Sequence, residues 1–110
     1  MKLHTLIEWL ERMNQEHPDG IVPYGFDKPY SWRGNYEDLA FEPKESAKIS
    51  DMLNHAKDSM GRTFMGWKGG EFKMDEYTTC WIAKHGESDD SDCIGTTLLK
   101  MWELSLNKST

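Results

Sequence analysis

Apolar residues near the start of the chain recur at the spacing of an amphipathic helix. Charged and polar residues separate five apolar positions: Leu3, Leu6, Ile7, Leu10 and Met13. This spacing predicts a helix with one buried face. Thr5 and Glu8 are spaced as in a capping box, which predicts that the helix begins at Thr5. Turn chemistry in Pro18-Asp19-Gly20 predicts its end.

Two strands are predicted after this helix. Residues 21–26 are rich in apolar side chains, and Pro23 places this strand at a sheet edge or a bulge, because proline cannot donate a ladder hydrogen bond. Residues 27–35 contain proline, glycine and asparagine, which predict a loop. Residues 36–41 are predicted to form the second strand, closed by Pro43.

A second helix is predicted from an N-cap at Ser50 to Met60. Its inward face would carry four apolar residues: Met52, Leu53, Ala56 and Met60. Gly61 suits the left-handed position that follows many helices.

The rest of the chain predicts further strands and a final helix. Residues 63–67 and 77–83 have the composition of strands, the latter most strongly. Two short links are expected, a tight turn at 68–70 and a bulge or connection at 74–76. Residues 85–92 are predicted to form an acidic loop. Apolar and polar residues nearly alternate over 98–106, as in a strand, but their spacing also fits a helix, which is the preferred interpretation. Residues 107–110 are expected to be a frayed end.

These elements predict one α+β domain over residues 1–110. A small antiparallel sheet of about four strands would pack with two or three helices. Hydrophobic residues make up 37% and charged residues 29% of the chain, as in a globular protein.

The net charge of −6 argues against a protein that binds duplex nucleic acid, which needs a basic face. Neither a signal peptide nor a transmembrane stretch is visible, so no membrane role and a cytoplasmic location are expected. Cys80 and Cys93 lack metal-ligand spacing and are interpreted as free thiols of a reducing compartment.

Catalytic patterns are missing from the sequence. The histidines have no metal-ligand spacing, and the acidic run at 87–92 lacks the glycine and the late glutamate of a calcium loop. We find no nucleophile motif and no carboxylate pair that stands out. The chain is therefore expected to be no enzyme and to need no cofactor or metal.

Two segments carry candidate binding chemistry. The first places an arginine among aromatic residues in a glycine-containing loop: Tyr30, Ser31, Trp32, Arg33 and Tyr36. Arginine can fork onto a phosphate, and an aromatic ring can stack on a base. The alternative, of equal weight, is that the arginine bonds its own loop while the aromatic side chains fill the core.

The second segment runs from Gly61 to Glu71. Its candidate ligand-binding residues are Arg62, Thr63, Trp67, Lys68, Gly69 and Gly70. Glycines allow a backbone to approach a ligand and to point amides at an anion. The order of residues is not that of a P-loop. Taken alone, this segment is better explained as a hairpin turn with an exposed lysine.

Several motifs resemble a group of small bacteriophage-encoded accessory proteins. They are Ser31-x-Arg33-Gly34-x-Tyr36, Leu39-Ala40-Phe41-Glu42-Pro43, Gly66-x-Lys68-Gly69-Gly70-Glu71 and Met74-Asp75-Glu76-Tyr77-Thr78. The likeness covers the chain from the first helix to about Ala83. It implies a phage protein that acts in the cytoplasm of an infected bacterium.

Small phage accessory proteins often counter host defence. One class, the sponges of the anti-Thoeris and anti-CBASS type, captures cyclic nucleotide signals as oligomers. The resemblance and the two segments together predict a homo-oligomer that binds a cyclic ADP-ribose isomer or a cyclic oligonucleotide without catalysis. Two alternatives stay open. One is an inhibitor that grips a host nuclease or CRISPR effector, and the other is a small enzyme that degrades a signal nucleotide.

Overall fold

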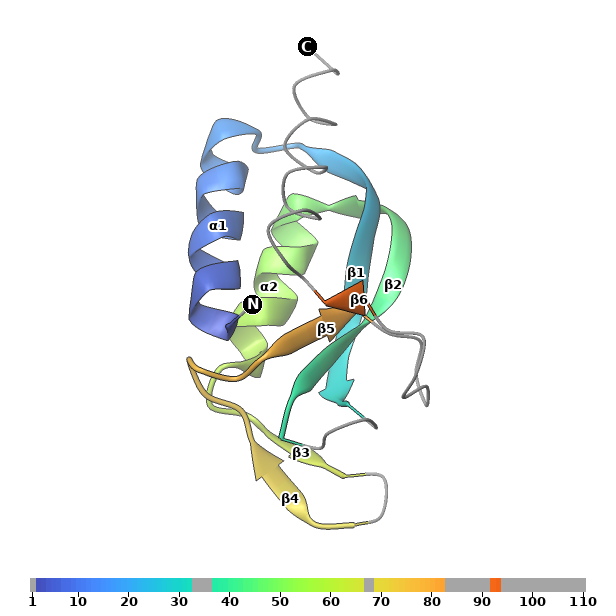
Figure 1. Ribbon diagram of the computed structural model, residues 1–110. Coiled ribbons are helices and arrows are strands. Elements are labelled where there is room, and N and C mark those ends of the chain that lie inside the picture. The colour runs from blue at the N-terminus through green and yellow to red at the C-terminus, as the bar shows by residue number, and fades with distance from the viewer. Residues whose placement is uncertain (1, 33–36, 67–68, 83–91, 94–110) are drawn as a thin grey trace.

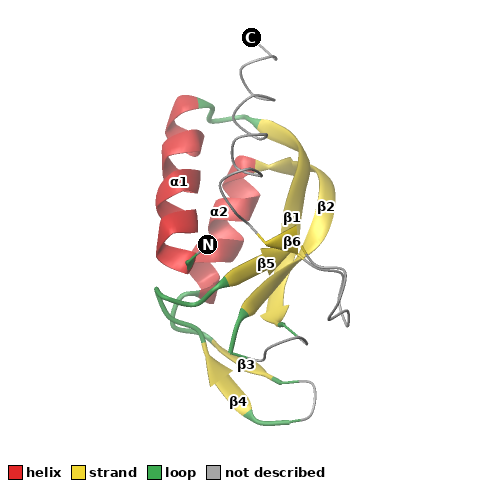
Figure 2. Ribbon diagram, viewed as in Figure 1, coloured by secondary structure: helices red, strands yellow, loops and turns green. Residues whose placement is uncertain are grey.

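The computed structural model describes residues 2–32, 37–66, 69–82 and 92–93. The described residues form two helices. Figure 1 and Figure 2 show these helices packed against a sheet, with a separate hairpin beside it. In chain order the described elements are α1 (Leu3–Glu16), β1 (Ile21–Ser31), β2 (Leu39–Lys48), α2 (Ile49–Ser59), β3 (Thr63–Met65), β4 (Glu71–Lys73), β5 (Cys80–Ile82) and β6 (Asp92–Cys93).

The predicted α+β class is confirmed. Four strands form a sheet in the order β1-β2-β5-β6, and β3 and β4 pair as an antiparallel hairpin. Within the sheet, β1–β2 and β5–β6 are antiparallel, whereas β2–β5 is parallel. The chain between β2 and β5 contains α2 and the hairpin, a connection long enough to return a strand in the same direction.

Helix α1 buries the five apolar residues that the spacing predicted. The predicted start at Thr5 is wrong, because the helix begins at Leu3 and no side chain caps it. The amides of Leu3 and His4 instead donate to the carbonyls of Thr78 and Glu76, at 2.9 and 3.0 Å. Backbone carbonyls from a distant turn therefore satisfy the orphan amides that a cap would otherwise serve.

The two long strands correct the predicted boundaries. Strand β1 continues to Ser31, so residues 27–31 are strand rather than loop; residues 33–35 of the predicted loop lie outside the described residues. The register against β2 shifts between Phe26 and Pro29, and β1 is an edge strand of the described sheet. The prediction of an edge or bulged strand is confirmed. The shift and the edge position let prolines stay in the strand.

Strand β2 spans Leu39–Lys48 rather than residues 36–41 and passes through Pro43. Residue 36 lies outside the described residues, whereas Glu37 and Asp38 precede the strand. Strand β5 pairs only with Leu39–Phe41, so β2 from Glu42 onward has β1 as its one partner among the described strands. A proline is tolerated where one side of a strand carries no ladder.

Helix α2 also begins two residues earlier than predicted. Lys48 occupies the N-cap position, and the amide of Ile49 donates to the carbonyl of Gly20 at 3.1 Å, so Ser50 lies inside the helix. Met52, Leu53 and Ala56 are buried as predicted, but Met60 follows the helix and is 38% exposed. Gly61 adopts φ +77°, which confirms the left-handed position.

The remaining predictions hold in part. Strand β3 covers 63–65 of the predicted 63–67, and Gly69 and Gly70 take positive φ values at the hairpin turn, as expected for 68–70. Strand β5 is shorter than the predicted 77–83, because residues 75–78 form a turn. Residues 67, 68 and 83–91, and the predicted helix and end over 98–110, lie outside the described residues.

The described core lies between the helices and one face of the four-stranded sheet. Leu39 and Phe41 of β2 and Ile82 of β5 pack there with the buried faces of α1 and α2. Because side chains alternate along a strand, the residues between them face the other way. Ala40 and Tyr30 are buried on that second face, where Trp32 and Trp81 pack against them.

Among the described residues, neither helix is long and apolar enough to cross a membrane.

Candidate functional site

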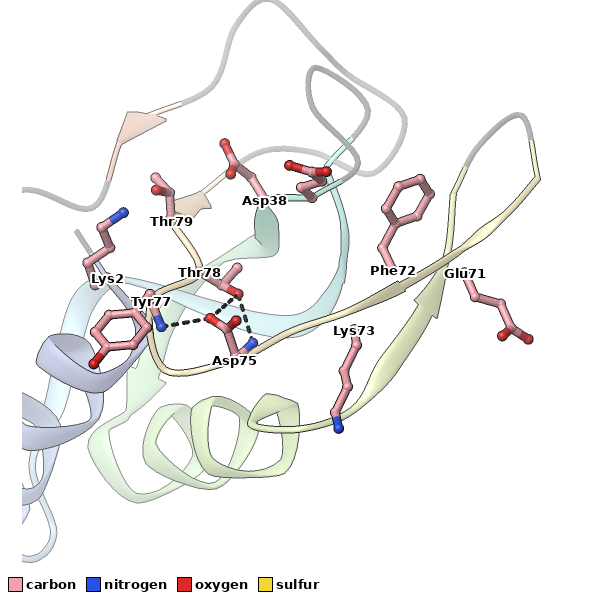
Figure 3. A pocket seen from close by; sticks show the side chains of 10 residues that line it. Lys2, Asp38, Glu71, Phe72, Lys73, Asp75, Tyr77, Thr78 and Thr79 are labelled. Carbon is pink, nitrogen blue, oxygen red and sulfur yellow. Dashed lines mark hydrogen bonds between the residues drawn. The ribbon is translucent and has the colours of Figure 1, made fainter.

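A hollow of about 430 Å³ lies where three segments of the chain meet (Figure 3). The segments are the residues before β2, the strand β4, and the turn that leads into β5. Lys2, at the start of α1, completes the lining. The lining residues are Lys2, Glu37, Asp38, Glu71, Phe72, Lys73, Asp75, Tyr77, Thr78 and Thr79.

The turn at Asp75–Thr78 is held by its own side chains. The Asp75 carboxylate accepts from the Tyr77 amide at 2.8 Å and from the Thr78 hydroxyl at 3.4 Å. The Thr78 hydroxyl in turn accepts from the Asp75 amide at 2.8 Å. This is an Asx-type turn, in which a short polar side chain replaces a backbone partner. Carbonyls of this turn also accept hydrogen bonds from the first amides of α1, so this part of the hollow is bonded to the helix.

Asp38, which also lines the hollow, accepts hydrogen bonds through both its backbone and its side chain. Its carbonyl accepts from the Trp32 amide at 3.0 Å, and its carboxylate accepts from the indole Nε1 of Trp81, also at 3.0 Å. The rings of Trp32 and Trp81 are stacked, with centroids 4.2 Å apart and planes at 22°. These contacts join the end of β1, the start of β2 and the middle of β5.

Strand β4 supplies an aromatic wall. Phe72 is half-buried and packs against the main core. Figure 3 shows its ring on one side of β4, whereas the side chains of Glu71 and Lys73 point to the other. The ring therefore adds an apolar surface to a hollow that the acidic residues before β2 also line.

The described lining is more acidic than basic. It contains four carboxylates (Glu37, Asp38, Glu71 and Asp75) and two ammonium groups (Lys2 and Lys73). Carboxylates accept hydrogen bonds and repel anions, so these groups favour hydroxyl, amide or cationic donors over phosphate. The described residues contain no cluster of three or more histidines, cysteines, aspartates or glutamates arranged to hold a metal ion.

The structure describes the first predicted segment from Tyr30 to Trp32. Tyr30 and Ser31 are 8% and 2% exposed and belong to β1. The indole Nε1 of Trp32 is buried and has no hydrogen-bond partner among the described residues. Arg33 and Tyr36 lie outside the described residues. The aromatic side chains that the structure describes here pack on the second face of the sheet.

The second predicted segment forms the β3–β4 hairpin. The guanidinium of Arg62 lies 4.7 Å from the centre of the Phe64 ring, and Thr63 pairs with Lys73 across the hairpin. Neither residue lines the hollow. Gly69 and Gly70 are exposed at the turn, with φ values of 93° and 85°. Trp67 and Lys68 lie outside the described residues.

Both segments nevertheless lead into the same hollow. Glu37 and Asp38 follow the first, Glu71 ends the second, and Phe72 follows it. None of these four was predicted as a ligand-binding residue, because an acid or a phenylalanine in a mixed sequence carries no spacing signal. The turn residue Asp75 did offer a signal, since aspartate side chains often bond the backbone two residues further on.

The chain matches no protein-family model, no curated protein and no solved structure.

Proposed function

We propose that this chain is a non-catalytic binding protein that sequesters a nucleotide-derived signal in the hollow between β4 and the residues before β2. One observation supports the proposal most directly. The described residues that follow each of the two candidate binding segments, Asp38 and Phe72 among them, line one hollow. A ligand in this hollow would contact residues that stand next to both segments in the chain.

The proposed roles follow from position in the sequence. Arg33 stands four positions before Glu37, and Lys68 stands three positions before Glu71. The described lining has more carboxylates than ammonium groups, and carboxylates repel phosphate. The phosphates of the ligand would therefore bind to these two cations. Tyr36 and Trp67 would offer stacking surfaces beside them.

The resemblance to small phage accessory proteins supplies the biological setting of the proposal. The ligand would be a cyclic ADP-ribose isomer or a cyclic oligonucleotide made by a bacterial defence system, and capture would occur in the cytoplasm of the infected cell. A homo-oligomer suits such a role, because so short a chain can enclose little of a ligand by itself.

Calorimetry of the full-length protein against cyclic ADP-ribose isomers and cyclic oligonucleotides tests the proposal. At least one ligand should bind, and Arg33→Ala and Lys68→Ala should each weaken binding about tenfold or more. Arg12→Ala and Lys44→Ala, which remove exposed cations elsewhere, should leave affinity unchanged. The bound ligand should be recovered intact after denaturation, whereas a degraded product would favour the enzyme alternative. The absence of binding across the panel would refute the proposal.

A second candidate function is inhibition of a host defence protein by direct contact. The surplus of carboxylates at the hollow, together with Tyr77 and Met65 at 63% and 67% exposure, favours it. Aromatic side chains anchor protein interfaces, and acidic surfaces attract proteins that bind nucleic acid. A pull-down from host lysate distinguishes the two functions: a stoichiometric nuclease or CRISPR effector would support inhibition, and a sponge should return none.

A further inference from the structure

One part of the hollow is built to accept hydrogen bonds. Asp38 and Glu37 line the hollow together with Phe72, and Thr78 and Thr79 line it where the turn enters β5. Glu71 and Lys73 point to the other side of β4. A phosphate next to Asp38 would meet a like charge, which disfavours it.

Asp38 presents its carboxylate in a fixed orientation. The Nε1 of Trp81 bonds one carboxylate oxygen, Oδ2, at 3.0 Å, and the stacked Trp32 ring restrains that indole. An ionised carboxylate has about four acceptor positions, and the indole is the one side-chain donor to it among the described residues, which leaves acceptor capacity for a ligand. An acceptor that is held in place by a second residue loses little freedom when a ligand binds.

A flat apolar ring and a fixed carboxylate that line the same hollow match the chemistry of a nucleoside. A nucleobase stacks on an aromatic face, and the ribose hydroxyls donate to a carboxylate, as they do in dinucleotide-binding proteins. Phe72 and Asp38 offer these two features in the same hollow.

We propose that the hollow is a nucleoside subsite, in which Asp38 accepts hydrogen bonds from the ribose hydroxyls, Phe72 stacks on the base, and Trp81 is a positioning residue for Asp38. This inference rests on the proposed function for the nature of the whole ligand. The phosphates of that ligand would lie outside the subsite.

NMR spectra of the ¹⁵N-labelled full-length protein, titrated with adenosine and with guanosine, test the subsite. At least one nucleoside should shift the amides of Asp38, Phe72, Thr78 and Thr79 at millimolar concentration, and inorganic phosphate should not. If neither nucleoside shifts them, or if phosphate shifts them instead, the inference is overturned. Calorimetry that detects a cyclic nucleotide while the NMR titration fails would reject the subsite but keep the proposed function. The failure of the subsite and the failure of the proposed function are therefore distinguishable.

Two variants test the role of each residue. Asp38→Asn should weaken binding of the nucleoside that shifts the spectrum by about tenfold. Trp81→Phe keeps a ring against Trp32 but removes the indole donor, and it should weaken binding of that nucleoside several-fold. It should leave binding of the matching 2′,3′-dideoxynucleoside unchanged, because that probe lacks the diol. An equal loss for both probes would contradict positioning through Asp38, and so would no loss for either.

Discussion

The imidazole Nε2 of His55 lies 3.1 Å from a carboxylate oxygen of Asp27 and joins α2 to β1. Asp27 stands between Phe26 and Pro29, where the register of β1 against β2 shifts. The contact therefore ties the irregular part of the edge strand to the helix that covers it. Both side chains are about one-third exposed, at 30% and 34%.

We expect a small but measurable coupling between these two residues. A double-mutant cycle with His55→Ala and Asp27→Ala, followed by urea denaturation, should give about 0.2–1 kcal/mol, because water screens a partly exposed pair. Lys57 and Glu11 form the matched control, since they are 3.9 Å apart and more exposed. A larger coupling for the control pair would contradict the proposed contribution of the His55 contact.

Replacing Gly25 with alanine should disturb the packing of α2 on the sheet. A methyl group at position 25 would lie 2.5 Å from Cβ of Ala47 and 2.9 Å from Sδ of Met52, closer than atoms can pack. Because the neighbours must move, Gly25→Ala should lower the free energy of unfolding by about 1–3 kcal/mol.

Gly61→Ala is the control for that substitution. Position 61 has open space around it, and its φ of +77° makes an alanine there unfavourable for the backbone alone. The expected cost is about 1 kcal/mol. Chemical denaturation should rank Gly25→Ala as the more damaging variant, and the reverse order would show that the region around Gly25 relaxes easily.

Truncation of Phe41 should test the main core. Its ring is fully buried, with its centroid 4.2 Å from that of Phe26. Phe41→Ala should lower the free energy of unfolding by about 3–5 kcal/mol, a large part of the stability of a small domain. Met65→Ala, at a residue 67% exposed, should change it by less than about 0.5 kcal/mol. Similar denaturation midpoints for the two variants would contradict the core assignment.

Arg62 should contribute to stability rather than to ligand binding. Its guanidinium lies over the Phe64 ring at 4.7 Å, and such an exposed cation–π contact contributes about 0.5–1 kcal/mol. Arg62→Ala should lose that amount in thermal or urea unfolding. It should leave affinity for any ligand of the hollow unchanged, because Arg62 is not among the lining residues. A selective loss of binding in this variant would place Arg62 at the site after all.

Patterns within one element were predictable from the sequence. The spacing of Leu3, Leu6 and Leu10 depends only on the period of the helix, and their burial follows from it. Gly61 likewise takes the backbone conformation that its position after a helix favours. Errors arose where a distant segment replaced a local partner. Thr5 has no capping role because carbonyls of the turn at 75–78 bind the first amides of α1.

The candidate site was less predictable for the same reason. The sequence pattern indicated two segments that stand next to lining residues of the hollow in the chain, through their glycines and aromatic residues. It could not identify Asp38, whose partner Trp81 lies 43 positions later in the chain. Strand propensity could not reveal that β2 and β5 run parallel, since pairing direction depends on the connection between them.

The hydrogen bonds from Leu3 and His4 to the turn at 75–78 also have a consequence for folding order. During synthesis α1 emerges first, but the acceptors for its first amides are made only after α2 and the hairpin. Contacts between segments so distant in sequence slow folding, because a long loop must close before they form. The start of α1 would then be among the last parts of the domain to gain protection, and pulsed hydrogen exchange during refolding would detect it as late protection at Leu3 and His4.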